Sequence, residues 1–452
     1  MTAQIETSNR STPFAVPTSR WVDSVVAALS PEELLLYRSN LLGSDLTVTN
    51  FGGGNTSAKL TQADVLTGED VAVLWVKGSG GDIGSMKLDG FATLYQDKLL
   101  GLERYYGGPD DDDKMVGYLP HCTFNLNGRA ASIDTPLHSL LPFAHVDHVH
   151  PDAIIALAAS SDGEQATAQI WNGRIGWLPW KRPGYTLGVM LRNYVQANPQ
   201  VEGVMLAGHG IICWGDSAKA CYEHTIGLIA DAAKYLNAKL AQGAAFGGAI
   251  TSSRPDRADI AADLMPRLRG LMTGARRKVG HYCDDAEVLE FVNSVDFERL
   301  AALGTSCPDH FLRTKIAPLT LDPARLDDDA YLAQKIADYR VLYGAYYDRC
   351  KRPNSPAMRD PNPVVVLVPG VGRFTFATDK TTARLAGEFY GNAINVMRGA
   401  EAIGDYIALD EQEAFDIEYW LLEEAKLQRM PAPKPLVGRI ALVTGGAGGI
   451  GA

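Results

Sequence analysis

The stretch His-Val-Asp-His-Val-His at residues 145–150 decides how this chain is interpreted. Its apolar surroundings predict a β-strand, and a strand sends alternate residues to the same face. The imidazoles of His148 and His150 are therefore expected side by side, close enough to bind one metal ion. A third histidine, His209, lies far along the chain in Leu-Ala-Gly-His-Gly at 206–210. Three imidazoles with an open fourth position are typical of a catalytic zinc site.

The alternative is that these histidines only end their strands. That would be the better interpretation of an isolated histidine. The combination of a His-x-His pair with a distant Gly-His-Gly favours a metal site. His145 does not share the alternation of the other two in a regular strand, so it is left out of the predicted ligand set.

The bulk composition limits the classes of function. The chain has 452 residues, of which 46% are hydrophobic and 21% charged, and this length predicts two or three globular domains. Its formal net charge of -11 disfavours nucleic acid and anionic membranes as partners. A bound phosphate must therefore be held by local groups rather than by the field of the whole protein.

The cysteines and the N-terminus predict a cytoplasmic protein. The six cysteines are scattered without a Cys-x-x-Cys pair, which is typical of reduced thiols. The segment from Met1 to Pro17 lacks the apolar core of a signal peptide. No run of about 18 apolar residues is present, so no membrane span is expected.

Several elements are expected from periodicity and from start and stop signals. A helix should begin after Ser30 with Pro31 in its first turn, because serine is a good N-cap. The expected strands and helices are as follows: strands at 46–58, 71–77, 143–158, 203–213 and 364–368; helices at 88–104, 133–141, 217–240, 259–274 and 330–350; and a solvated acidic loop at 110–113.

A repeat is predicted across the chain. Val-Met-Leu-Ala-Gly-His-Gly from residue 204 and Val-Leu-Val-Pro-Gly-Val-Gly from residue 366 both precede a short strand, a turn and a long helix. When position 204 is aligned with position 366, Val371 stands where His209 stands. The two interpretations are a duplicated lobe that lost its metal ligand and an incidental likeness between β-α units.

The last segment predicts the start of a further domain. Pro-Ala-Pro-Lys-Pro at 431–435 is a stiff linker, and residues 438–451 are an apolar strand running into a Gly-rich turn. This resembles the opening of a short-chain dehydrogenase. One strand and one turn cannot form a dinucleotide-binding fold. We therefore expect a truncated dehydrogenase domain and no nucleotide cofactor.

Residues 30–245 resemble the class II, zinc-dependent aldolases, a family that also includes adducin-like domains. The similarity is strongest to rhamnulose-1-phosphate and fuculose-1-phosphate aldolases. The continuation resembles bifunctional rhamnulose-1-phosphate aldolase/short-chain dehydrogenase proteins. The resemblance implies an α/β fold, with a mixed sheet flanked by helices and a second α/β lobe. The expected domains are a flexible arm at 1–20, the aldolase domain at 21–250, the second lobe at 259–428, and the linker with the truncated domain at 430–452.

The resemblance also assigns the metal and the base. It implies one zinc ion per subunit, held by His148, His150 and His209. Ser132-Ile133-Asp134 resembles the family's Ser-Ser-Glu segment, in which the glutamate moves the proton. Asp134 replaces that glutamate with a side chain one methylene shorter. The alternative is that Asp134 is the N-cap of the helix containing Pro136.

Two Gly-rich turns and a serine match the family's phosphate site. The first turn comprises Gly53, Gly54 and Asn55, and the second comprises Lys77, Gly78, Ser79 and Gly80. Glycines let backbone N–H groups approach an anion closely. Ser132 would be the third element, and Trp177 to Gly184 would lie near the rim of the active site. Each turn alone would more often be structural.

The resemblance implies a zinc-dependent aldolase that cleaves a ketose 1-phosphate reversibly. L-Rhamnulose 1-phosphate is the first choice, giving dihydroxyacetone phosphate and lactaldehyde. The alternatives are a sugar-phosphate 4-epimerase of the same fold and a non-catalytic adducin-like scaffold. The expected partners are a small sugar phosphate and further copies of the chain, with a tetramer as in the family, and no nucleic acid or membrane.

Overall fold

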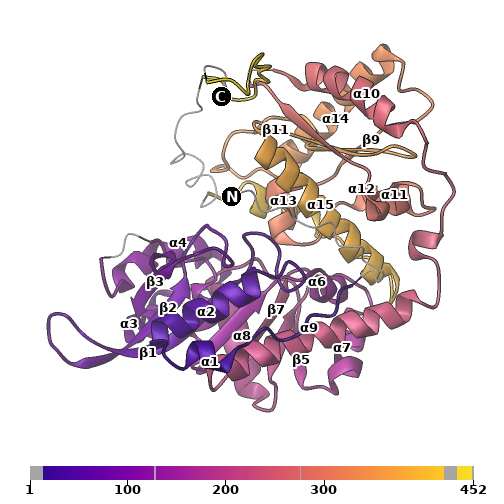
Figure 1. Cartoon of the computed structure of the whole chain (residues 1–452). Helices are drawn as coiled ribbons and strands as arrows, with labels where there is room; N and C mark the ends of the chain where they lie inside the picture. The colour runs from indigo at the N-terminus through magenta and orange to yellow at the C-terminus, as the bar shows by residue number, and fades with distance from the viewer. Residues whose placement is uncertain (1–13, 127–128, 275, 422–434, 450–452) are drawn as a thin grey trace. The chain divides into compact units, whose positions relative to one another are not determined.

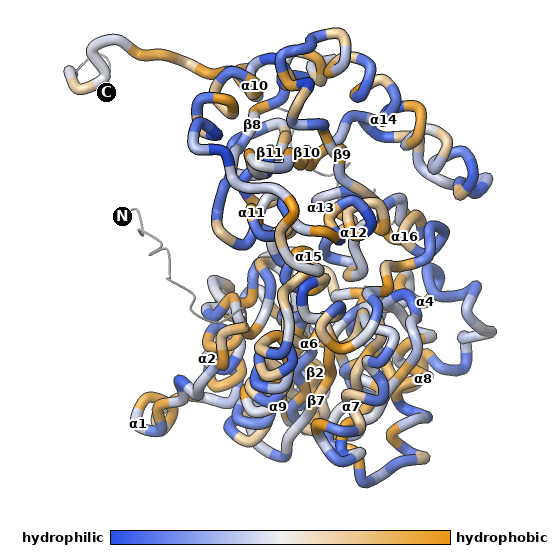
Figure 2. The backbone as a smooth tube through the Cα atoms, turned by 90° about the vertical axis from the view of Figure 1, so that its right-hand side faces the viewer, coloured by the Kyte–Doolittle hydropathy of each residue, from blue (hydrophilic) through white to orange (hydrophobic). Residues whose placement is uncertain are grey.

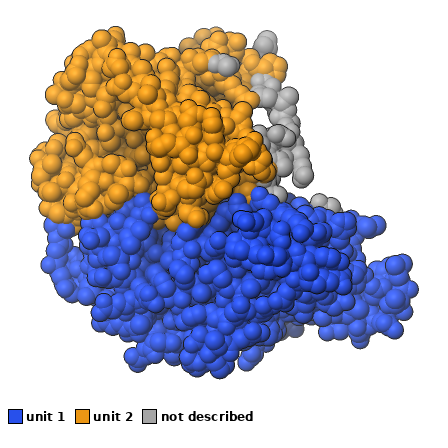
Figure 3. Space-filling view, turned by 180° about the vertical axis from the view of Figure 1, so that it is seen from behind, with its two compact units in different colours: residues 1–244, 395–408 blue, residues 245–394, 409–452 orange. Residues whose placement is uncertain are grey.

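The computed structural model describes residues 14–126, 129–274, 276–421 and 435–449. The chain forms two compact α/β units, coloured separately in Figure 3. The first unit contains residues 1–244 and 395–408, and the second contains residues 245–394 and 409–452. Figure 1 follows the chain through both of them.

The first unit is built on a seven-stranded mixed sheet with the order β3-β2-β1-β4-β7-β6-β5. All neighbours are antiparallel except β5 and β6. The central position of β4 places the histidine strand between β1 and β7. The strands are β1 (Asn55–Ala63), β2 (Asp70–Lys77), β3 (Phe91–Tyr95), β4 (His145–Val149), β5 (Ile175–Leu178), β6 (Gly203–Leu206) and β7 (Gly210–Gly215).

Helices cover both faces of this sheet. On one face α6 and α9 pack in a core with Ile154, Ile211 and Ile229, and on the other α5 and α8 pack around Leu137 and Ile212. The first of the long helices, α2, begins with the expected cap at Ser30. The helices are α1 (Asp23–Val26), α2 (Pro31–Gly43), α3 (Gln96–Gly101), α4 (Asp112–Tyr118), α5 (Thr135–Ser139), α6 (Asp152–Ala158), α7 (Gly163–Trp171), α8 (Tyr185–Ala197) and α9 (Ala218–Leu240).

The second unit has a four-stranded sheet with the order β8-β11-β10-β9. Its apolar core joins β10 and β11 to α10, α14 and α16, and β10 is hydrophobic along its length (Figure 2). Its strands are β8 (Val279–Cys283), β9 (Leu319–Thr320), β10 (Val365–Val368) and β11 (Gly372–Ala377). Its helices are α10 (Arg257–Met272), α11 (Ala286–Val292), α12 (Phe297–Leu303), α13 (Pro308–Thr314), α14 (Asp329–Cys350), α15 (Lys380–Glu401, which runs on into the first unit) and α16 (Glu411–Glu418).

Several predicted elements were wrong. Residues 153–158 do not continue the histidine strand but belong to α6. Pro151 ends the strand. The helix was not recognised because every residue of this apolar run is buried, so the run shows no alternation of polar and apolar residues. The predicted helix at 88–104 contains β3, and the predicted strand at 46–58 begins only at Asn55. The acidic run is not a solvated loop: Asp112 is buried at the start of α4 and accepts hydrogen bonds from Thr186.

The predicted repeat has the same strand register in both copies. In the first hairpin Gly203 pairs with Cys213, and in the second Val365 pairs with Thr375, which stand at the equivalent positions of the repeat. The helices that follow, α9 and α15, begin at the same offset. This agreement supports a duplicated hairpin-and-helix unit.

Two outlying segments of the first unit, near residue 14 and at 395–408, make contacts with the rest of it. Phe14, which the sequence places in a flexible arm, is buried, and its backbone N–H donates to Asn237 of α9. Residues 395–408 return to the unit, where Ile407 donates to the carbonyl of Ala159. Residues 1–13 lie outside the described part of the chain.

The predicted strand near residue 438 is not formed. Residues 435–449 form turns in the described part of the chain, and 450–452 lie outside it. The predicted linker at 430–435 also falls largely on residues that are not described.

Candidate metal centre and active site

The three predicted ligands come from two neighbouring strands. His148 lies in β4 and His150 follows its end, while His209 lies in the tight turn between β6 and β7. Because β4 pairs directly with β7, the turn is brought back to the end of the histidine strand. His148, His150 and His209 are all buried.

The three imidazoles converge on one point. The Nε2 atom of His148 lies 2.8 Å from Nε2 of His150 and 3.2 Å from Nε2 of His209. One ligand nitrogen from each ring falls within 4.8 Å of the others. Such a set of nitrogens fits a divalent metal such as zinc.

Hydrogen bonding and burial keep two of the three rings, those of His148 and His209, in the form that binds metals. Nδ1 of His148 lies 2.9 Å from the carbonyl oxygen of Ile211. A carbonyl only accepts, so Nδ1 carries the proton and the lone pair of Nε2 faces the other two histidines. Burial lowers the pKa of His209 well below its usual value, which keeps that ring neutral.

The Gly-His-Gly turn is shaped by close contacts. A Cβ atom on Gly210 would lie 2.6 Å from the carbonyl oxygen of Val149 and 2.7 Å from Cδ2 of His150. Gly208 has a φ of +63°, in the left-handed region. The glycines therefore let His209 approach the histidine strand. Trp180, from the predicted rim segment, lies edge-on to His209 with 6.4 Å between ring centroids.

Asp134 lies beside this cluster through Asn55. In the sheet register, Asn55 is directly opposite His148, so their side chains share one face. Asn55 Nδ2 donates to Asp134 Oδ2 at 2.5 Å, and Ser132 Oγ lies 3.3 Å from the same oxygen. Asp134 occupies the N-cap position of α5, but its side chain makes no capping hydrogen bond. Its carboxylate is therefore turned to the sheet rather than to the helix.

A second polar contact fixes α5 over the same face. Ser57 Oγ lies 2.8 Å from Nδ1 of His138, which is fully buried. Asp134 and His138 are four residues apart on a helix, and Asn55 and Ser57 are two apart on a strand, so the two spacings match. Lys59 extends the pattern by donating to the carbonyls of His138 and Phe143, and burial lowers its pKa to about 8.

The first Gly-rich turn packs against the histidine strand, β4. Gly54 has a φ of +73°, and a Cβ atom there would lie 2.9 Å from the carbonyl oxygen of His148. Gly53 donates its N–H to the carbonyl of Asn50. The close approach of the two backbones is therefore sufficient to explain the glycine at position 54. The turn also places Asn55 within hydrogen-bonding distance of Asp134.

The second Gly-rich turn adjoins the segment of Ser132. Gly78 forms a bridge with Ala131, and Ser79 donates its N–H to the carbonyl of Ala130 at 2.8 Å. Two residues of this turn, Lys77 and Gly80, line a pocket of about 300 Å³ together with the following Gly81. Ser132, the first turn and the three histidines are not among the described residues that line it.

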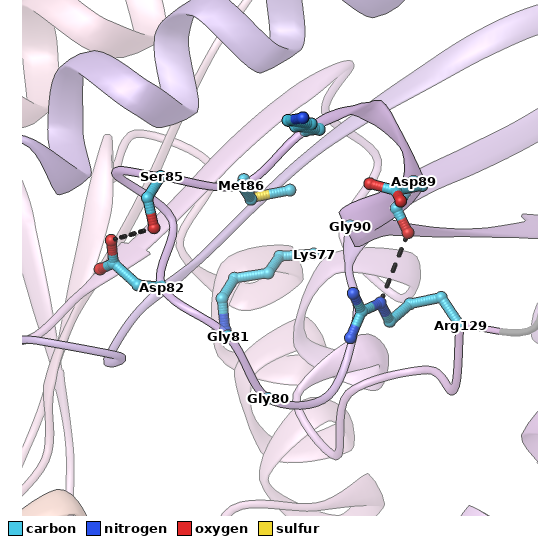
Figure 4. Close-up of a pocket in the computed structure, with 10 residues that line it drawn as sticks. Lys77, Gly80, Gly81, Asp82, Ser85, Met86, Asp89, Gly90 and Arg129 are labelled. Atoms are coloured by element: carbon cyan, nitrogen blue, oxygen red, sulfur yellow. Dashed lines mark hydrogen bonds between the residues drawn. The ribbon is translucent and has the colours of Figure 1, made fainter. Parts of the chain in front are cut away.

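Arg129 also lines this pocket, and the sequence analysis did not predict it as a site residue. Figure 4 shows Lys77 extending toward Gly81, while Arg129 enters from the opposite side and donates to the carbonyl of Asp89. Lys87 adds a third cation to the lining. A Cβ atom on Gly78 would lie 2.1 Å from the side chain of Arg129, so this glycine makes room for it. No motif marks a lone arginine in a loop, so only the fold reveals it.

Comparisons with known families agree with this architecture. Residues 33–236 match the Class II Aldolase and Adducin N-terminal domain, and residues 259–427 match the second domain of class II aldolases. Together these matches define a two-domain protein of the class II aldolase type. The chain belongs to the class II aldolase and adducin family, whose aldolases are metal-dependent and act on sugar phosphates.

Individual relatives are similar over different lengths. The chain is 40% identical over 441 residues to the uncharacterized oxidoreductase YuxG of Bacillus subtilis (strain 168), covering 95% of this chain and 63% of that protein. It therefore spans less than two thirds of that relative.

Solved structures are similar to about half of the chain. The N-terminal class II aldolase domain of a conserved protein from Thermoplasma acidophilum is 31% identical, with a TM-score of 0.45, over 49% of this chain and 99% of that one. L-Fuculose-1-phosphate aldolase from Thermus thermophilus is 16% identical, with a TM-score of 0.32, over 47% of this chain and 98% of that one.

Within the described residues, no helix has both the length and the apolar character needed to cross a bilayer.

Proposed function

We propose that this chain is a metal-dependent aldolase that cleaves a ketose 1-phosphate into dihydroxyacetone phosphate and a small aldehyde. L-Rhamnulose 1-phosphate, giving lactaldehyde, is the first choice of substrate. The observation that carries the proposal is the convergence of three imidazole nitrogens beside a buried carboxylate. Family membership supports the same class of reaction.

The histidines would hold one zinc ion through His148, His150 and His209. When bound, the metal would act as a Lewis acid on the carbonyl and hydroxyl oxygens of the substrate. The neutral state of His209 and the tautomer of His148 support this role, because metal ligation needs the lone pair of each ring.

Asp134 would move the proton. In cleavage, its carboxyl group returns a proton to the carbon beside the carbonyl of dihydroxyacetone phosphate, and in condensation its carboxylate takes that proton away. Asn55 and Ser132 both contact Oδ2. These two contacts hold the carboxylate in one orientation on the face of the sheet that carries His148.

The phosphate group would bind near the two Gly-rich turns. The pocket containing Lys77, Arg129 and the backbone of Gly80 supports this assignment, because cations and exposed N–H groups both attract a phosphate. The other proposed contributors to phosphate binding are Gly53, Gly54, Gly78, Ser79 and Ser132. Local cations are required here, since the chain as a whole is acidic.

The test is product analysis with purified protein. L-Rhamnulose 1-phosphate and L-fuculose 1-phosphate are supplied separately, and dihydroxyacetone phosphate and aldehyde are measured with and without a chelator. We expect chelator-sensitive release of both products, abolished in His148→Ala and retained in His121→Ala, whose histidine is exposed.

The rival functions give different products. Formation of an epimeric sugar phosphate without dihydroxyacetone phosphate would identify an epimerase. Metal-free protein with no turnover of either substrate would favour a non-catalytic scaffold. Full activity of His148→Ala would contradict the proposed metal role.

A further inference from the structure

The second unit places an arginine where the first has a core isoleucine. Ile211, in β7, is fully buried in the apolar core that also contains Ile229 of α9. When the two hairpins are aligned through their shared register, its counterpart is Arg373 in β11. A strand position that packs an aliphatic side chain in one copy therefore carries a charge in the other.

The helix changes in step with the strand. The counterparts of Thr225 and Ile229 in α9 are Gly387 and Gly391 in α15. A Cβ atom on Gly387 would lie 3.1 Å from Nη2 of Arg373, and one on Gly391 would lie 3.5 Å from Nη1. The two glycines thus make the room that the guanidinium occupies between β11 and α15.

Two of the three guanidinium nitrogens of Arg373 have no hydrogen-bond partner among the described residues. The residue is 5% exposed, and its Nε and Nη1 atoms are buried without a hydrogen bond. The nearby carboxylates are engaged elsewhere. Asp285 accepts from the thiol of Cys283, and Glu388 pairs with Arg384.

An unpaired buried charge is costly, and an anion bound to it would offset that cost. Burial lowers the pKa of Arg373, because the charged form loses hydration that its surroundings do not replace. Five N–H donors in a planar fork match the oxygens of a carboxylate or a phosphate. Removing water from such a group is tolerated when an oppositely charged group binds it.

We propose that Arg373 forms an oxyanion-binding site in the second unit, between β11 and α15. Its ligand is a carboxylate or phosphate group of a small molecule. The site is built from other residues than the histidine cluster, and the proposal does not depend on the proposed aldolase activity.

The test uses the repeat to design the variant. Arg373→Ile, combined with Gly387→Thr and Gly391→Ile, rebuilds the side chains that pack in the first unit. Arg349→Gln is the matched control, because it removes from α14 of the same unit a guanidinium that already pairs with a carboxylate, that of Glu411. Thermal unfolding of the full chain is followed while chloride is replaced by sulfate, phosphate or formate at constant ionic strength.

We expect the anions to raise the melting temperature of the wild type and of Arg349→Gln. The triple variant should bind them roughly tenfold more weakly or worse, because charge-assisted hydrogen bonds are lost. Stronger binding of phosphate than formate would identify a phosphate ligand, and the reverse a carboxylate. Arg373→Met, similar in length but uncharged, serves if the triple variant does not fold. An equal anion effect in the wild type and in the Arg373 variants, or none in the wild type, would overturn the proposal.

Discussion

Asp134 is the residue on which proton transfer depends in this account. Replacing it with asparagine keeps the shape and the contact with Ser132 but removes the group that carries the proton. We expect Asp134→Asn to lower kcat by about 10²–10⁴-fold, the usual contribution of a general acid–base group. Metal content should stay unchanged, because Asp134 is not a proposed ligand.

Asp134→Glu is the informative partner of that variant, since it restores the family's residue. It should keep measurable activity and bind metal normally. Steady-state kinetics with metal analysis would check both. A kcat of Asp134→Asn within a few fold of the wild type would leave Asp134 with only a structural role.

His138 gives a prediction for pH. Burial holds its pKa well below the usual 6.5, so it stays neutral in the folded protein while the unfolded chain takes up a proton as the pH falls below that value. The unfolded state then binds more protons, so the free energy of unfolding decreases with falling pH, by at most about 1.4 kcal/mol per pH unit for one histidine.

His138→Gln should remove that dependence. Urea unfolding between about pH 7 and pH 5 should show the stability gap between wild type and variant narrowing as the pH falls. The exposed His121→Gln should leave the wild-type slope intact. A gap that stays constant over this range would show that His138 is not held neutral by burial.

For individual residues, the sequence predicted correctly which side chains lie together when their spacing along one strand was sufficient to place them. His148 and His150 are an example, because strand alternation is local. The contact of Asn55 with Asp134 and the position of Arg129 depend on pairings between distant segments, and a single sequence carries no local signal for them.

Among the secondary-structure elements, the β6–β7 hairpin is predicted to hold His209 and His150 in place for metal binding. Gly210→Ala would place a methyl group against Val149 and the ring of His150. We expect a loss of about 1–3 kcal/mol in the free energy of unfolding, as for other overpacked sites, together with weaker metal binding.

Gly227→Ala is the matched control for this variant. It lies in α9 with no atom near the added methyl group, so the substitution should be neutral or stabilising. Thermal unfolding and metal titration of both variants test the difference. Equal behaviour of the two would mean that the hairpin does not constrain His150.

Elements with a clear pattern or cap were predicted well, and fully buried runs were not. Helix α9 starts after Ser217 as expected, with the serine side chain accepting from Ala220. Helix α6 was predicted as a strand because an all-buried run has no polar face to reveal its period. Strand β3 was predicted as part of a helix, since its short apolar run continues into α3.

For the whole molecule, the sequence predicted an α/β fold with a second lobe, and the structure confirms it. It did not predict that residues 395–408 return to the first unit. Such a return depends on long-range packing, which composition and periodicity do not report. The repeat could be seen in the sequence because both hairpins keep the same Gly-x-Gly turn and helix start.

Metal content is the most direct test of the account, because the proposed chemistry needs one divalent ion held by three histidines. The measurement is metal per chain in purified wild type, in His121→Ala and in His209→Val, the last of which copies the residue of the second repeat. We predict about one equivalent of zinc or a similar ion in the first two proteins and almost none in His209→Val. Equal metal in all three, or none in the wild type, would contradict the account.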